Sequence, residues 1–123
     1  MPTTIRITAG DVVVEAELND TICGQAVAAA LPIDASASTW GEEIYFSIDV
    51  DCQPEDMQAV VELGDLAYWP PGSAFCMFFG QTPMSSAEEI RPASAVGVIG
   101  RMTGDLAALR GVPSGASVKI ERV

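Results

Sequence analysis

The chain has 123 residues, of which 49% are hydrophobic, and its 17 acidic and 6 basic residues give a net charge of −11. This length is typical of one domain, which we expect to span residues 1–123, and the apolar content excludes an extensively disordered protein. The negative charge repels phosphate backbones, so nucleic acid is a poor partner, and no apolar run reaches the roughly 18 residues of a membrane-spanning helix.

Histidine is absent from the sequence. Its absence excludes Ser-His-Asp and Cys-His catalysis, histidine general bases and histidine-ligated metals. The acidic segment 49–56 does not fit an EF-hand calcium loop, because Pro54 and Val60 stand where that loop needs Gly and Glu. A solvated loop fits this segment better than adventitious binding of Ca²⁺ or Mg²⁺. We therefore expect no metal site and no cofactor.

The three cysteines are far apart in the sequence. Residues 1–6 lack the basic-then-apolar order of a secretion signal, so we expect a cytoplasmic protein. In that reducing compartment Cys23, Cys52 and Cys76 are expected to be free thiols.

The N-terminal part of the chain predicts a β-hairpin followed by a helix. Residues 4–9 and 12–18 alternate apolar and polar side chains, as half-buried strands do. Residues 19–21 offer helix N-caps, and apolar residues then recur at helical spacing until Pro32 ends the helix. Cys23 lies on the apolar stripe of this helix, where we expect a small core residue.

All eight aromatic residues lie within residues 40–79. Residues 66–69 and 75–79 are rich in aromatic and apolar side chains, which predicts two antiparallel strands. The link between them, Pro-Pro-Gly, predicts a type II turn in which Gly72 adopts a positive φ. A further short strand is expected at residues 44–48, after a loop at residues 33–39.

Alternation along the second aromatic strand places its side chains on two faces: Phe75, Met77 and Phe79 on one, Cys76 and Phe78 on the other. Both faces are apolar. This pattern predicts burial on both sides of the sheet, or burial on one side and a pocket on the other.

The C-terminal part of the chain begins with a long irregular segment at residues 80–92, and loops of that length are often functional. A buried strand is expected at residues 94–102, then a short helix capped by Thr103, then a last strand at residues 117–123. The whole pattern predicts a mainly all-β domain that removes its strand edges by closing into a barrel.

Three motifs in the middle of the chain carry a family resemblance: WGEEIYF at 40–46, GDLAYWPPG at 64–72 and FFGQTPMS at 78–85. The order of elements on both flanks agrees more loosely. The sequence resembles the cyclophilins and, more closely, a small family of uncharacterised bacterial and archaeal cyclophilin-like proteins. This resemblance implies a closed eight-stranded barrel with two short helices.

Cyclophilins are prolyl isomerases, so the resemblance also suggests prolyl isomerase activity. They bind an X-Pro peptide in an apolar groove, and an arginine polarises the amide, whose rotation has a barrier of roughly 20 kcal/mol. The corresponding region here, residues 40–47, contains Glu42 and Glu43 but neither arginine nor histidine. The catalytic residues of the signature therefore do not carry over.

We expect the aromatic residues to line an apolar cleft that binds a small molecule or a proline-containing peptide, with Glu42 and Glu43 as polar contacts at its rim. The alternative for any single aromatic residue is core packing. The candidate binding residues are Trp40, Tyr45, Phe46, Tyr68, Trp69, Phe78, Phe79 and Thr82.

Two other hypotheses remain open. In the first, the protein is a weak peptidyl-prolyl isomerase or another amide-metabolising enzyme, and Glu42 or Glu43 acts as acid or base. A carboxyl group can play this part at neutral pH only if burial raises its pKa. Otherwise the aromatic patch is the interface of a homodimer, since exposed apolar patches commonly mark partner surfaces.

Overall fold

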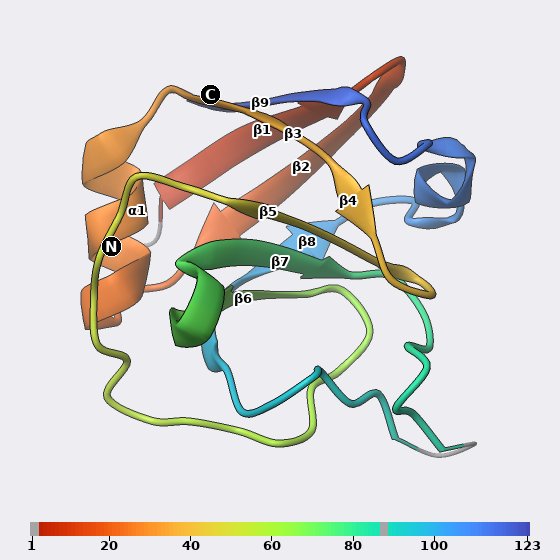
Figure 1. The fold of residues 1–123 in the computed structure, drawn as a ribbon. Helices are drawn as coiled ribbons and strands as arrows, with labels where there is room; N and C mark the ends of the chain where they lie inside the picture. The colour runs from red at the N-terminus through yellow and green to blue at the C-terminus, as the bar shows by residue number, and fades with distance from the viewer. Residues whose placement is uncertain (1–2, 87–88) are drawn as a thin grey trace.

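The computed structural model describes residues 3–86 and 89–123 and shows a single nine-stranded sheet that curls into a barrel (Figure 1). The strand order is β3-β9-β1-β2-β8-β6-β7-β5-β4. The elements in chain order are β1 (Thr3–Ala9), β2 (Val12–Leu18), α1 (Ile22–Ala30), β3 (Ile33–Ser36), β4 (Ser38–Thr39), β5 (Glu43–Ser47), β6 (Asp65–Trp69), the 3-10 helix η1 (Pro70–Gly72), β7 (Ala74–Phe78), β8 (Gly97–Thr103), the 3-10 helix η2 (Ala107–Gly111) and β9 (Ser117–Arg122).

The barrel closes through β3 and β4, which stand at the two ends of the strand order but are separated in sequence by Ala37 alone. Strand β3 pairs with β9 and β4 pairs with β5. Counting β3 and β4 as one bent strand turns the nine strands into eight, so the predicted eight-stranded barrel is close to the observed one. The closed arrangement leaves few unpaired strand edges.

The expectation of a loop at residues 33–39 was wrong, because these residues form β3 and β4. The segment is small and polar, with Asp34, Ser36 and Ser38 breaking any apolar run. Its strand conformation comes from backbone pairing on both sides, with β9 and with β5. Such long-range pairing leaves no alternating pattern in the sequence.

The aromatic hairpin of β6 and β7 has the two apolar faces that alternation predicts. Leu66, Tyr68, Phe75, Met77 and Phe79 pack into the main core inside the barrel. Ala67, Trp69, Cys76 and Phe78 belong to a second cluster on the other face. Two connections, from β5 to β6 and from β7 to β8, cover this second face and are joined by bridges between Gln58 and Val96 and between Val61 and Ile90 (Figure 1).

The link between β6 and β7 is the 3-10 helix η1, so the predicted type II turn was wrong. The residue with positive φ is Ser73, at 46°, rather than Gly72. Two consecutive prolines fix φ near −65°, which suits a 3-10 turn, and the chain reverses one residue later. The Ser73 N–H donates to the carbonyl oxygen of Pro70 at 3.1 Å.

Helix α1 begins at the N-cap Thr21, whose hydroxyl oxygen accepts from the Gly24 N–H at 3.1 Å, and ends before Pro32 as the sequence predicts. The expected second helix is η2. Its N-cap is Leu106, the Asp105 carboxylate just before it accepts from the Ala107 N–H at 2.9 Å, and Thr103 lies in β8. None of the described helices has the length and apolar character needed to cross a bilayer.

The expectation of three free thiols was wrong. Cys23 on α1 and Cys52, in the connection after β5, form a disulfide with their Cα atoms 5.7 Å apart. The two residues are 29 positions apart in sequence, and only the folding of the helix against this connection brings them together. Cys76 is free and buried.

Candidate functional site

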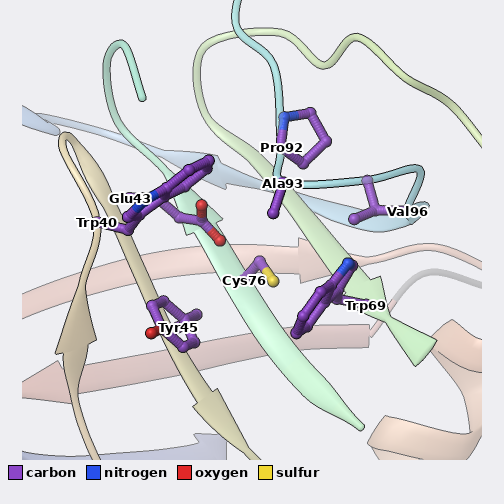
Figure 2. A pocket seen from close by; sticks show the side chains of 8 residues that line it. All are labelled: Trp40, Glu43, Tyr45, Trp69, Cys76, Pro92, Ala93 and Val96. Atoms are coloured by element: carbon purple, nitrogen blue, oxygen red, sulfur yellow. The ribbon is translucent and has the colours of Figure 1, made fainter. Parts of the chain in front are cut away.

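A pocket of about 220 Å³ lies on the second face of the aromatic hairpin, outside the barrel interior. Strands β5, β6 and β7 form its base, and the connection between β7 and β8 covers it. Its lining residues are Trp40, Glu43, Tyr45, Trp69, Cys76, Pro92, Ala93 and Val96 (Figure 2).

Aromatic rings form the sides of this pocket. Figure 2 shows Trp40 and Trp69 on opposite sides, with Cys76 between them and Tyr45 below Trp40. The indole N–H of Trp69 donates to the Ser94 hydroxyl at 2.7 Å, which fixes the ring against the covering connection. All three rings are half-buried, so part of each is exposed toward the pocket. The site is thus apolar with ring faces available for contact.

A tight turn places Trp40 and Glu43 on the same pocket. The Trp40 N–H donates to the Glu43 carbonyl at 2.9 Å, and the Glu43 N–H donates back to the Trp40 carbonyl at 3.2 Å. Gly41, at φ 60°, supplies the left-handed conformation inside this turn. The turn links β4 to β5, so the sheet itself sets the direction of both side chains.

Glu43 has a carboxyl group inside the pocket, and only 5% of the residue is exposed. Figure 2 shows this group pointing toward the Cys76 thiol between the aromatic rings. Burial raises the carboxyl pKa from 4.5 to about 7, and a hydrogen bond from Cys76 opposes part of that rise. Burial also raises the pKa of the Cys76 thiol, so the thiol stays protonated.

No basic residue lines this pocket, and each of the six basic side chains of the protein lies elsewhere. Four arginines pair with acidic side chains, Arg122 donates to the Ala28 carbonyl, and Lys119 is exposed on β9. The buried carboxyl of Glu43 therefore has no positive partner among the residues that the structure describes. A charged carboxylate in such surroundings is costly unless something else neutralises it.

Glu42 and Glu43 are adjacent in sequence but do not share a site. The Glu42 carboxylate pairs with Arg110 and lines a separate, wider groove together with Phe79 and Gln81. Arg110 is thus held away from the aromatic pocket. Glu43 lies inside the pocket instead of at its rim.

The structure brings three of the seven predicted aromatic residues, Trp40, Tyr45 and Trp69, to the pocket. Phe46 stacks on Phe75 in the barrel interior, with ring centroids 5.3 Å apart. Tyr68 is fully buried and its hydroxyl donates to the Val50 carbonyl at 2.6 Å.

The remaining candidates also lie off the lining. Phe78 and Phe79 are buried, the first in the cluster beneath the pocket and the second in the main core. Thr82 is buried, and its hydroxyl donates to the Arg91 carbonyl, which stabilises the covering connection.

Four lining residues were not among the sequence candidates: Cys76, Pro92, Ala93 and Val96. Alternation along β7 places Cys76 on the pocket face and was the one available signal for it. Pro92 and Ala93 reach the pocket through the path of an irregular connection, for which the sequence carries no periodic pattern. Among the described residues, no group of three or more His, Cys, Asp or Glu side chains is arranged to hold a metal ion.

A model of the family described as "Cyclophilin-like" matches residues 3–121 of the chain. The chain belongs to the cyclophilin-like family. The solved structures similar to this cyclophilin-like protein include the solution structure of a hypothetical protein from Archaeoglobus fulgidus. The two chains are 45% identical, with a TM-score of 0.82, and the match covers 99% of this chain and 95% of the other. Among curated proteins, no relative matches the chain.

These comparisons establish family and fold for the cyclophilin-like protein. The archaeal relative is described as hypothetical, so the relation brings no activity with it.

Proposed function

We propose that this cyclophilin-like protein binds a small organic molecule in the aromatic pocket between Trp40 and Trp69. The observation that carries the proposal is the buried carboxyl of Glu43, which points into an apolar pocket that no basic residue lines. Folding alone gives no reason to keep a carboxyl there, because burying it without a counter-charge destabilises the protein. Strongly perturbed ionisable groups in clefts are typical of functional sites.

The size of the pocket favours a small ligand over a peptide. Pockets for drug-sized ligands usually have volumes of roughly 300–1,000 Å³, and this one has about 220 Å³. It accepts one ring or one side chain at a time. A proline-containing peptide would place a single residue inside and leave the rest of its chain on the surface.

A fragment screen by thermal shift and NMR tests this proposal, using the wild type, Trp69→Ala and Leu63→Ala. Trp69 lines the aromatic pocket, whereas Leu63 is exposed on the separate groove that Glu42 lines. We expect hits that bind the wild type and Leu63→Ala equally and lose at least tenfold in affinity with Trp69→Ala. Hits that bind Trp69→Ala as well as the wild type place the site elsewhere and refute the proposal.

One observation favours a second candidate, an enzyme acting on an amide. A carboxyl with a pKa of about 7 is half-ionised at neutral pH and suits general acid–base catalysis. A protease-coupled assay on an X-Pro peptide tests the isomerase version. Because no arginine lines the pocket, we expect no acceleration at micromolar protein. An acceleration that Glu43→Gln abolishes would favour the enzyme over the binding protein.

A further inference from the structure

We infer that the ligand of this pocket is a small organic ammonium compound that donates N–H groups to the Glu43 carboxylate while its apolar part lies between Trp40 and Trp69. This inference rests on the proposed function. It adds the chemical class of the ligand, which neither the family nor the archaeal relative supplies.

The Glu43 carboxyl lacks a counter-charge among the described residues. Glu43 is 5% exposed, and its hydrogen-bonding neighbour in the pocket is the Cys76 thiol, a weak donor. Arg91, next to the lining residue Pro92, is engaged with Glu89 at 2.6 Å, and Arg110 is engaged with Glu42. An ammonium group supplies the positive charge and the strong N–H donors that the protein itself does not place there.

The aromatic sides of the pocket also suit a cation. Trp40 and Trp69 face the pocket from opposite sides and Tyr45 lies along its base (Figure 2). Ring faces carry partial negative charge, and a cation within about 6 Å of such a ring is attracted by roughly 0.5–2 kcal/mol, with Trp the best partner. Indole rings and a carboxylate around one small space favour a cation more than any neutral group of the same size.

The charges around the pocket disfavour an anionic ligand. An anionic ligand would lie beside Glu43 with no basic residue to balance the two negative charges, and the net charge of −11 repels anions from the whole surface. The same net charge raises the local concentration of cations. A neutral ligand fits only if Glu43 stays protonated and donates to it.

The pH dependence of binding separates an ammonium ligand from a neutral one. Within residues 3–86 and 89–123, the titratable groups that face the pocket are Glu43 and Tyr45 on β5 and Cys76 on β7, whereas the neighbouring Glu42 faces Arg110. Burial holds the Glu43 pKa at about 7 and keeps the Cys76 thiol protonated. An ammonium ligand requires ionised Glu43 and gains affinity as the pH rises through 7; a neutral acceptor requires the protonated form and loses affinity.

The experiment compares three probes of one shape: cyclohexylammonium, cyclohexanol and cyclohexanecarboxylate. NMR titrations follow the two Trp indole N–H signals at pH 6 and pH 8. The ionised fraction of a group with a pKa of about 7 rises from about 0.1 to about 0.9 over this range. We therefore expect cyclohexylammonium to bind about tenfold more tightly at pH 8, and at pH 8 more tightly than either other probe.

Two matched variants locate the effect. Glu43→Gln is expected to weaken cyclohexylammonium binding at pH 8 at least tenfold and to remove its pH dependence, while Glu42→Gln keeps both. A melting temperature of Glu43→Gln at pH 8 that is no lower than that of the wild type shows that the loss is not unfolding. If Glu42→Gln loses binding instead, the ammonium site is not at Glu43 and the inference is overturned.

Other results also overturn the inference. Cyclohexanol binding as tightly as cyclohexylammonium at pH 8, or ammonium affinity that falls with pH, assigns the pocket to neutral ligands and leaves the proposed function standing. If none of the three probes moves the indole signals, the ammonium class is excluded. The fragment screen with Trp69→Ala then decides separately whether the pocket binds anything.

Discussion

Glu43 is a carboxyl whose surroundings favour its neutral form, and this has a consequence for stability. Its pKa is about 7 in the folded protein and 4.5 without burial. The folded state therefore holds the proton more tightly than the unfolded chain does. The free energy of unfolding that Glu43 contributes is greatest below about pH 4.5 and falls as the pH rises to about 7, by about 3 kcal/mol in all.

Replacing Glu43 with Gln removes this dependence. We expect Glu43→Gln to match the wild type within about 1 kcal/mol at pH 5 and to exceed its free energy of unfolding by up to about 3 kcal/mol at pH 8. Urea unfolding at both pH values measures the difference, with Glu42→Gln as the matched surface control. A difference between Glu43→Gln and wild type that is the same at both pH values contradicts the burial of a titrating carboxyl.

The sequence identified the aromatic zone but did not separate its pocket residues from its core residues. Trp40, Tyr45 and Trp69 line the pocket, whereas Tyr68, next to Trp69 in the chain, is fully buried. Alternation distinguishes the two faces of a strand. It does not tell which face meets the barrel interior and which meets a covering connection, since both faces here are apolar.

At the level of elements, the turn between β4 and β5 controls the site because it carries Trp40 and Glu43. Gly41 in this turn has φ 60°, and a Cβ there would lie 2.8 Å from both the Gln81 carbonyl oxygen and Pro83 Cδ. Gly10, in the turn between β1 and β2, has φ 59° but its Cβ would meet only Ala116, at 3.8 Å. The two glycines share a backbone conformation and differ in the space around them.

We expect Gly10→Ala to lower the free energy of unfolding by about 1–2 kcal/mol, which is the cost of the left-handed backbone conformation alone. Gly41→Ala should cost clearly more, because the turn must also move away from the segment at 81–83, and it should weaken ligand binding. Thermal unfolding of both variants measures the difference. Equal losses of stability in the two variants would mean that the contact with residues 81–83 does not constrain the turn.

The disulfide between Cys23 and Cys52 fastens α1 to the connection that leads from β5 to β6. Removing a cross-link that closes a loop of this length is expected to lower the free energy of unfolding of the protein by about 3–4 kcal/mol. Cys52→Ala should therefore melt at a lower temperature than the wild type. Adding a thiol reductant should lower the melting temperature of the wild type and leave that of Cys52→Ala unchanged. Three titratable thiols in unfolded, unreduced wild type would contradict the pairing.

The strands that sequence patterns predicted are those that alternate between core and surface. Both strands of the opening hairpin, β1 and β2, were expected within one residue of their observed bounds, and β6 and β7 carry dense aromatic and apolar runs. Strands β3 and β4 were not predicted, because backbone pairing with β9 and β5 determines their conformation and their side chains do not. Helix η2 was expected one turn too early, since the polar residues before it offer more than one cap.

At the scale of the whole molecule, the acidic charge is a uniform destabilising force. With 17 acidic and 6 basic residues, exposed like charges repel one another in the compact state. Raising NaCl from about 10 mM to about 1 M shortens the screening length from roughly 30 Å to 3 Å. We expect the melting temperature followed by circular dichroism to rise by several degrees, while glucose at equal osmolality raises it less. A fall in melting temperature with salt would show that local ion pairs outweigh the net repulsion.

The pairing of β9 sets the moment at which the protein can finish folding. This strand comes after every other strand in the sequence, yet it lies between β1 and β3 and joins two of the earliest elements of the chain. During synthesis, a nascent chain that still lacks residues 117–122 holds an open sheet with its apolar concave side uncovered. The interior is therefore sealed only once β9 has paired with both β1 and β3, and a chain that has not yet formed this pairing exposes apolar surface that favours aggregation.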